Sequence, residues 1–288
     1  MRNDQAEGLR RWIGQANGQK NGKTIAVISG KGGVGKSNFS LNFSIQLSLL
    51  GKKVLLFDMD IGMGNIDILL GNTAERNIVD FFAKGLSFDD IITDGPGNLQ
   101  FISGGSGLAQ LFSMNDEELG LFLGEFAAIQ DRYDYIFFDL GAGISAETAK
   151  FLQCVDEIIT ITTPEPTSIM DAYSIVKYLH MKNEHLPIKL LCNRAETERQ
   201  GRETIKRLQT TLRRFLGKEL AALGSLPDSK YVKKAVIRQM PFTILYPYSD
   251  ITRAMQQLAA GFVSGTAEEP IRQPTAFLDK FKHFFIGR

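Results

Sequence analysis

The sequence predicts an α/β fold in which a mostly parallel sheet carries helices on both faces. Short runs rich in β-branched residues alternate with helix-length segments over most of the chain, and this alternation is typical of βαβ units. A glycine-rich turn separates the first such run from the first long helical segment. With 43% hydrophobic and 23% charged residues, the chain has the composition of a globular protein with a sizeable core.

The expected elements follow one another without an internal boundary. We expect strands at residues 24–28, 54–57, 99–102, 135–138, 157–161 and 188–192. We expect helices at residues 36–50, 116–129, 146–154, 167–182, 199–216, 250–262 and 275–286. In the first helix, Leu41, Ile45 and Leu49 or Leu50 are expected to share the buried face. The predicted organisation is a polar leader over 1–23, one domain over 24–264, and a linker with a terminal helix over 265–288.

The charge and cysteine content exclude several classes of protein. The 288 residues carry 33 Lys and Arg against 32 Asp and Glu, so a globally basic nucleic-acid binder is not expected. The two cysteines, Cys154 and Cys192, lie far apart and form neither a disulfide framework nor a zinc ribbon pattern. No apolar run reaches the roughly 18 residues of a membrane span. We therefore expect a cytoplasmic protein.

The glycine-rich turn carries a phosphate-binding motif. Residues 30–37 read G-K-G-G-V-G-K-S, which satisfies the P-loop pattern between a strand and a helix. Backbone N–H groups of such a loop approach phosphates, and the helix N-terminus favours the anion. Lys36 is expected to reach the β- and γ-phosphates, and the Ser37 hydroxyl to ligate Mg²⁺. The expected nucleotide-binding residues here are Gly32, Gly33, Val34, Gly35, Lys36, Ser37 and Asn38.

Carboxylates follow two of the predicted strands. Asp58 and Asp60 end the second strand, and Asp139 ends the apolar run 135–138. Carboxylates at these strand ends face the ligand crevice of an open α/β sheet. Asp139 is therefore the expected Walker B residue, which holds Mg²⁺ through water.

A second lysine in the loop, Lys31, makes the motif resemble the deviant Walker A family, to which MinD and ParA belong. The resemblance implies an ATPase that forms an ATP-sandwiched homodimer, in which Lys31 reaches the partner's phosphates. It also implies that Asp60 activates the attacking water and that Asp58 supports the Mg²⁺ shell. The segment with Gly141 and Gly143 looks like switch II of that family.

Two segments indicate whether the nucleotide base is adenine or guanine. Residues 193–196, N-R-A-E, only approach the N-K-x-D pattern of guanine-specific proteins. In MinD-like proteins an Asn-Arg at this place contacts adenine, which implies adenine contacts from Asn193 and Arg194. A later Pro-Asp loop closes the base pocket in that family, and Pro227 and Asp228 match it. An ordinary helix cap and turn remains the alternative for Pro227 and Asp228.

The terminal helix is amphipathic. Its aromatic face consists of Phe277, Leu278, Phe281, Phe284 and Phe285, and its other face carries Lys280, Lys282 and His283. Such a helix is typical of reversible binding to an anionic membrane surface, here the inner face of the cell membrane, and it resembles the membrane-targeting helix of MinD. Two copies on a dimer would act together, so ATP-driven dimerisation would control attachment. A helix docked on the domain core is the alternative.

The leader separates this chain from MinD, which begins almost at its first strand. Residues 4–10, D-Q-A-E-G-L-R, resemble a motif of the flagellar MinD-like ATPases, the FlhG group, also called YlxH or FleN. The resemblance implies that Gln5 enters the nucleotide site of the GTPase FlhF and stimulates it. It also implies flagellar C-ring switch proteins as partners, with a contact surface expected on the helices within 167–216.

Other functions remain open at this stage. A MinD-type division-site regulator shares the core and the tail but does not explain the leader. A ParA-type DNA-partitioning ATPase needs a basic surface, which arginines such as Arg199, Arg202 and Arg213 could supply. An iron–sulfur carrier would need paired cysteines, which the sequence lacks.

Overall fold

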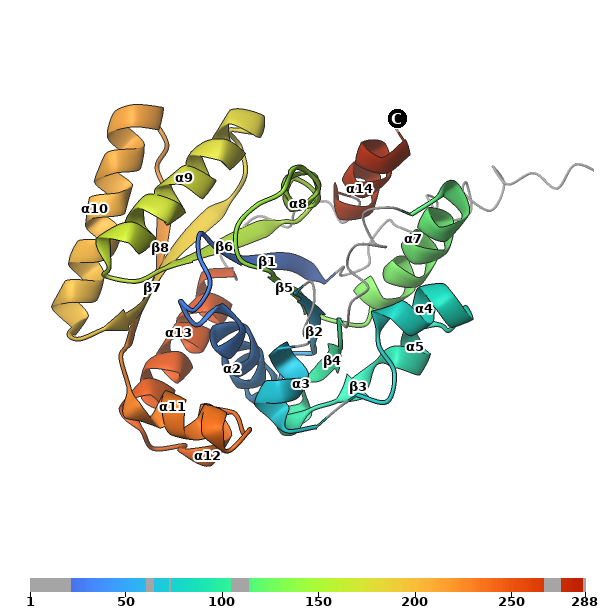
Figure 1. Ribbon diagram of the computed structural model, residues 1–288, viewed down its shortest axis with the longest axis horizontal. Coiled ribbons are helices and arrows are strands. Elements are labelled where there is room, and N and C mark those ends of the chain that lie inside the picture. The colour runs from blue at the N-terminus through green and yellow to red at the C-terminus, as the bar shows by residue number, and fades with distance from the viewer. Residues whose placement is uncertain (1–21, 61–64, 73, 105–113, 267–275, 287–288) are drawn as a thin grey trace, which may run out of the picture.

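The computed structural model describes residues 22–60, 65–72, 74–104, 114–266 and 276–286. Eight strands form one sheet in the order β3-β4-β2-β5-β1-β6-β7-β8 (Figure 1). All neighbours pair in parallel except β3, which runs antiparallel to β4 at the edge. The strands are β1 (Lys23–Ser29), β2 (Val54–Met59), β3 (Thr93–Asp94), β4 (Gln100–Ile102), β5 (Tyr135–Leu140), β6 (Glu157–Thr162), β7 (Ile188–Ala195) and β8 (Ala221–Pro227).

The helices fall into a long group and a short group. The long helices are α2 (Lys36–Leu49), α7 (Asp116–Gln130), α9 (Pro166–Lys182), α10 (Glu198–Leu216), α13 (Asp250–Thr266) and α14 (Ala276–Ile286). The short helices are α3 (Asn65–Leu70), α4 (Ile78–Lys84), α5 (Phe88–Ile91), η1 (Pro96–Asn98), α8 (Ala146–Leu152), α11 (Lys230–Ile237) and α12 (Phe242–Leu245).

The sheet separates two hydrophobic layers, because successive residues of a strand face opposite sides. In β1, Ile25 and Val27 belong to the layer beneath α2, α3 and α11–α13. Ala26 and Ile28 belong to the other layer, which α7–α10 and α14 cover. Figure 1 shows these two groups of helices on opposite sides of the strands. The predicted α/β fold with helices on both faces is therefore confirmed.

Helix α2 is more enclosed than its sequence suggests. It packs against β2 and β5 on one side and against α13, α12 and α3 on the other, so most of its residues are buried. Leu41 and Ile45 are buried as predicted. The prediction was wrong for Leu49 and Leu50, which are 55% and 49% exposed because the helix ends where its neighbours stop covering it.

The strands β3 and β8, the short helices α3, α4, α5, α11 and α12, and the turn η1 were not predicted. The β8 residues Ala221 and Ala222 are exposed, and Gly224, with a φ of 145°, lies beside a shift in the register with β7. Such a segment lacks the β-branched run that marks a buried strand. It pairs with β7 and lies between α10 on one face of the sheet and α13 on the other, so tertiary contacts form it.

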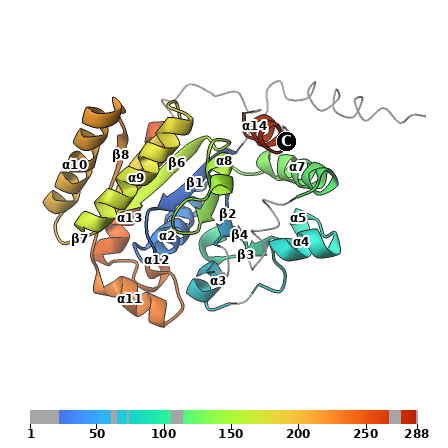
Figure 2. The ribbon, with the colours of Figure 1, turned by 45° about the horizontal axis from the view of Figure 1, so that its top comes forward.

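The terminal helix α14 lies against α7 (Figure 2). Phe277 and Phe281 are fully buried there. The Phe281 ring stacks on Phe122 at 5.5 Å between centroids, and the Phe277 ring lies 4.7 Å from that of Phe126. In this structure the aromatic face of the helix therefore completes one hydrophobic layer of the domain. The side chains of Phe284 and Phe285 lie outside the described residues.

Candidate functional site

The phosphate-binding loop connects the end of β1 to the start of α2. Gly33 and Gly35 have φ values of 79° and 91°, a left-handed conformation that disfavours other residues. A Cβ on Gly35 would also lie 2.5 Å from Nδ2 of Asn193. A side chain at position 35 would therefore push the loop away from β7, which carries the expected adenine contact.

Lys36 and Asp139 form an ion pair beneath the loop. Nζ of Lys36 lies 3.0 Å from Oδ1 of Asp139, and both side chains are buried. The Ser40 hydroxyl donates to the same oxygen at 2.8 Å. Oδ2 of Asp139 is buried and has no hydrogen-bond partner among the described residues. A buried carboxylate oxygen normally has a partner, so Asp139 retains an acceptor for the water shell of a metal ion.

Asp58 lies beside Asp139 because β2 and β5 pair in register. Their Cα atoms are direct partners in the parallel ladder. The backbone N–H groups of Ile66 and Asp60 donate to the Asp58 carboxylate at 3.0 and 3.2 Å. Burial, and next the neighbouring Asp139 charge, raise the pKa of Asp58 to about 7. Opposing these effects, a cation would favour the ionised form.

We predict that Asp58 gives the folded protein a characteristic pH dependence. Its pKa rises from 3.8 to about 7 on folding, so between these values the folded state holds a proton that the unfolded chain has released. The free energy of unfolding without nucleotide should therefore fall by about 1.4 kcal/mol per pH unit within this window because of this group. Asp58→Asn should flatten the dependence by that amount. Urea unfolding of both proteins from pH 5 to 7.5 measures it, and equal slopes would contradict the prediction.

Asp60 lies at the mouth of the phosphate cavity. Nδ2 of Asn65 donates to its carboxylate at 2.6 Å, and a Cβ on Gly141 would lie 3.1 Å from Asp60 Oδ1. The carboxylate thus borders both the helix after β2 and the loop after β5. The cavity has a volume of about 310 Å³ and is lined in part by Ser29, Gly32, Gly33, Gly35, Lys36, Ser37, Asn38, Asp60, Asn65 and Ala142.

A second cavity of about 480 Å³ continues from the loop toward β7 and β8. It contains the expected base contacts Asn193, Arg194, Pro227 and Asp228, and it shares Gly33, Gly35 and Asn38 with the phosphate cavity. Nδ2 of Asn193 donates to the Val34 carbonyl at 2.7 Å. Nη1 of Arg194, a residue with φ of 58°, donates to the Gly33 carbonyl at 3.1 Å. These contacts tie the base side of the site to the phosphate loop.

Sequence analysis missed the apolar wall of this second cavity. Phe39, Val232, Val236, Ile237 and Met255 line it from α2, α11 and α13. These helices come from distant parts of the chain, so no local motif marks the wall. It also missed Asn65 and Ser40, single polar residues whose partners Asp60 and Asp139 become neighbours only in the fold.

Lys31 points away from its own phosphate cavity. Its ammonium lies 2.5 Å from Oε2 of Glu165 and 3.1 Å from the Thr167 hydroxyl, at the start of α9. The same ion pair lowers the pKa of the exposed Glu165 carboxyl. Lys31 is not among the residues that line either cavity. Two lysines of one loop therefore have different surroundings, since Lys36 is buried against Asp139 and Lys31 is at the surface.

The remaining predicted residues are distributed as follows. Gly141 precedes Ala142, which borders the phosphate cavity, and the Gly143 amide donates to the Ser29 carbonyl at 3.0 Å. Asp67, on the short helix α3 after β2, accepts from the Ser103 hydroxyl at 2.6 Å and does not line the cavity. Residues 61–64 and Gln5 lie outside the described residues.

The donor set fits a hydrated magnesium ion. In the described part of the chain no group of three or more His, Cys, Asp or Glu side chains could enclose a metal by itself. The Ser37 hydroxyl, Asp58 and the unpartnered oxygen of Asp139 are instead the groups available. Mg²⁺ typically keeps several waters and binds through one or two protein oxygens together with phosphates. When bound, it would supply neutralisation of phosphate charge.

The loop, the cavities and the carboxylates define a P-loop nucleotide-binding protein of the MinD/ParA type. Residues 25–242 match the CobQ/CobB/MinD/ParA nucleotide binding domain family, so the chain belongs to that family. Within it, the chain belongs to the group that contains FleN and YlxH. It is 32% identical to the antiactivator FleN of Pseudomonas aeruginosa, covering 82% of this chain and 85% of FleN. It is 34% identical to the flagellum site-determining protein YlxH of Helicobacter pylori, covering 91% and 88%.

Solved structures support the fold. MinD of Pyrococcus horikoshii, solved with Mg-ADP, superposes with a TM-score of 0.68 at 22% identity and covers 86% of this chain and 99% of its own. MinD in the MinC:MinD complex of Aquifex aeolicus gives 0.66 at 25% identity, covering 84% and 96%. The predicted MinD/ParA-like fold is confirmed.

Proposed function

We propose that this chain is an ATP-dependent molecular switch that regulates the number and placement of flagella. The two relatives FleN and YlxH are named for an antiactivator and for flagellum site determination. The chain spans most of the length of both. The observation that carries the ATP-dependent switch is the pair of lysines in the loop. Lys36 lies beneath the phosphate cavity, and Lys31 lies outside it.

Lys31 is the residue that we assign to dimerisation. Its side chain is about one-third exposed, and its ammonium is paired with Glu165, a surface carboxylate on the same chain. Surface ion pairs contribute little free energy, so a partner's ATP phosphates can compete for this lysine. ATP binding would then favour a homodimer across the two loops, and hydrolysis with Asp60 as the activating residue would return it to monomers.

The leader supports a role toward the GTPase FlhF. We predict that the full chain accelerates GTP hydrolysis by purified FlhF and that Gln5→Ala removes most of this effect, because Gln5 is the residue assigned to FlhF's nucleotide site. Gln5→Ala should leave ATP binding by this chain unchanged, since the ATP site lies in the domain after residue 23. The measurement is FlhF turnover at saturating GTP, with Gln15→Ala as the control in the same leader. Equal stimulation by all three proteins would refute the role of Gln5.

Reversible membrane attachment is the second part of the proposal. None of the helices in the described ranges combines the length and hydrophobicity of a membrane span. Helix α14 offers a different mode, with its aromatic face turned toward α7 and Lys280 exposed. We infer that the aromatic face must leave α7 before it can enter a bilayer, and that dimerisation favours this release. The anionic inner surface of the cell membrane is the expected target.

Phe281→Glu is predicted to abolish ATP-dependent binding to anionic liposomes. A carboxylate at this position opposes insertion into the bilayer and also opposes docking among Phe122 and Phe151. The variant should therefore lose about 3 kcal/mol or more of unfolding free energy as well. Phe122→Leu is the control, because it loosens the same cluster from α7 while leaving the tail intact. Co-sedimentation with Mg-ATP distinguishes them, and retained pelleting of Phe281→Glu would exclude α14 as the anchor.

Flagellar C-ring switch proteins are the further partners that we propose. Helices α9 and α10 expose Lys177, Arg207 and Phe215 on the surface opposite β6–β8. A division-site regulator remains a second candidate, because the solved MinD structures share the fold. The FlhF measurement separates the two candidates, because only the flagellar function requires that the leader stimulate GTP hydrolysis by FlhF.

A further inference from the structure

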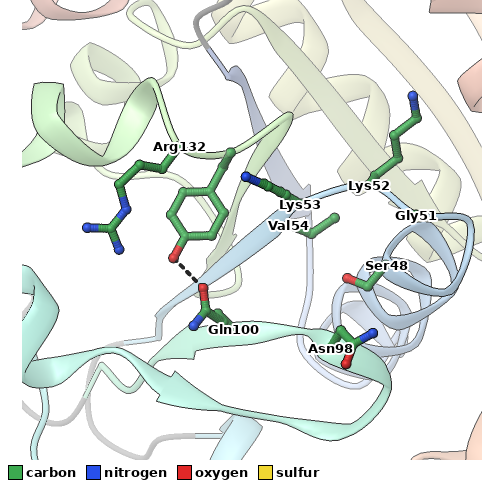
Figure 3. Close-up of a pocket in the computed structure, with 9 residues that line it drawn as sticks. Ser48, Gly51, Lys52, Lys53, Val54, Asn98, Gln100 and Arg132 are labelled. Atoms are coloured by element: carbon green, nitrogen blue, oxygen red, sulfur yellow. Dashed lines mark hydrogen bonds between the residues drawn. The ribbon is translucent and has the colours of Figure 1, made fainter.

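A separate cavity of about 410 Å³ lies at the end of the sheet where the parallel strands begin, on the opposite side from the nucleotide site. It is bordered by the end of α2, the start of β2 at Val54, the start of β4 at Gln100, and the turn before β5 at Arg132 and Tyr133 (Figure 3). In a parallel sheet the amino ends of all strands lie on one side and their carboxyl ends lie on the other. Since the nucleotide cavities lie where β1, β2 and β5 end, this cavity is a different site.

Hydrogen-bond donors line the cavity, and no carboxylate is among its lining residues. Asp89 lies behind Arg132 and accepts from its guanidinium at 2.6 Å, and Asp94 accepts from the Gln100 amide at 2.9 Å. The hydroxyl of Tyr133 donates to Gln100 Oε1 at 2.7 Å. These contacts hold the wall formed by Gln100, Arg132 and Tyr133 in place and occupy polar groups of all three side chains. The other polar side chains that line the cavity belong to Ser48, Lys52, Lys53 and Asn98.

Ser48 is the group that points to a ligand. Its side chain lines the cavity and is only 4% exposed, and its Oγ has no hydrogen-bond partner among the described residues. Leaving a buried hydroxyl unpaired costs free energy. Figure 3 shows this oxygen directed toward the space between Lys53 and Gln100. An acceptor bound in that space would satisfy it.

We propose that this cavity binds the phosphoryl group of a small phosphate ester. A phosphate supplies several acceptor oxygens and a negative charge, which match one ammonium and one hydroxyl. The cavity lies within the size range of small-ligand sites and is larger than a single phosphate needs. A glycerol phosphate unit, either free or as the headgroup of an anionic lipid, has the required chemistry. The proposal is independent of the flagellar assignment.

The neighbouring lysines provide a matched pair of variants. Lys53 and Lys52 precede β2 and carry the same charge. In Figure 3 the Lys53 side chain extends toward the wall formed by Arg132, whereas the Lys52 ammonium points away from the other residues. Both lysines border the cavity, so Lys53→Gln removes the ammonium on the side of Arg132 and Lys52→Gln removes the ammonium that points away. Ser48→Ala removes the hydroxyl and keeps a residue that suits a helix.

The test uses the full chain preloaded with Mg-ADP, so that the P-loop does not take up the probe. Calorimetric titration with glycerol phosphate should show one site, weakened about tenfold in Lys53→Gln and several-fold in Ser48→Ala, and unchanged in Lys52→Gln. Melting curves confirm that the variants fold. The second arm measures binding to vesicles that contain phosphatidylglycerol. If the variants rank in the same order of affinity there, the ligand is the lipid headgroup. If they differ only in the titration with glycerol phosphate, the ligand is a free ester.

Two outcomes would overturn the proposal. One is the absence of saturable binding of both probes to the wild-type protein. The other is an equal loss in Lys52→Gln and Lys53→Gln, because that result describes general attraction to a basic surface. This site is tested with Mg-ADP bound, whereas the tail assignment is tested with Mg-ATP, so failure of the tail assignment is distinguishable from failure of this site.

Discussion

Lys36→Gln should lower the affinity for Mg-ATP about 100-fold, which corresponds to about 2.7 kcal/mol and is typical of a lost hydrogen bond to a charged group. Lys36 is the buried cation that borders the phosphate cavity beneath the loop. Glutamine can still donate to Asp139, but it brings no positive charge to the phosphates. Isothermal titration calorimetry with Mg-ATP measures the loss directly, and binding at wild-type affinity would refute the assignment.

The control for Lys36→Gln must remove a hydrogen bond to the same buried carboxylate, Asp139, without changing a residue that lines the cavity. Ser40→Ala does this, because Ser40 donates to Asp139 Oδ1 and does not line the phosphate cavity. We expect it to lose about 1 kcal/mol of unfolding free energy and to retain most of the affinity for ATP. If both variants lost affinity equally, the effect of Lys36 would be structural support of Asp139.

Asp60→Asn should bind ATP and hydrolyse it at least about 100-fold more slowly, the range expected for loss of a general base. The amide keeps the size of the side chain and can still accept from Asn65, so the position of the helix after β2 should be preserved. Because hydrolysis ends the dimeric state in the proposed cycle, the variant should accumulate as a dimer with ATP. Size-exclusion chromatography with ATP and a phosphate-release assay measure the two effects.

Asp67→Asn is the matched control for Asp60→Asn. It makes the same chemical change seven residues later, at a carboxylate that bonds Ser103 and does not line the phosphate cavity. We expect near wild-type hydrolysis from this control. An Asp60→Asn protein that remains monomeric with ATP, or that hydrolyses ATP normally, would remove Asp60 from the proposed mechanism.

The sequence was sufficient for the elements whose signals are local. The strands that begin at Lys23, Val54 and Tyr135 and the helices that begin at Lys36 and Asp116 follow from apolar periodicity and from caps such as Asn115, whose side chain accepts from Glu117 and Glu118. The P-loop is equally local, because its glycines, lysine and serine are contiguous. A short window of sequence contains all the information that such features need.

The tertiary structure decided how the separate signals meet. The register of β2 against β5 sets Asp58 beside Asp139, and this proximity, together with burial, raises the pKa of Asp58. The sequence gives the two carboxylates 81 positions apart and says nothing of their register. The apolar wall of the base cavity, the contact of Lys31 with Glu165 and the cavity at Ser48 likewise join segments that are distant in the chain.

The terminal helix illustrates the same division. Its sequence determined that it is a helix with one aromatic face, since the spacing of Phe277 and Phe281 fixes that face. What the face contacts was decided by α7, which supplies Phe122 and Phe126 at the matching positions. The hydrophobic effect is not directional, so an apolar face alone does not specify whether protein or lipid will cover it. Local periodicity determines the secondary structure, whereas the partner of an apolar face depends on the surfaces that the rest of the chain brings to it.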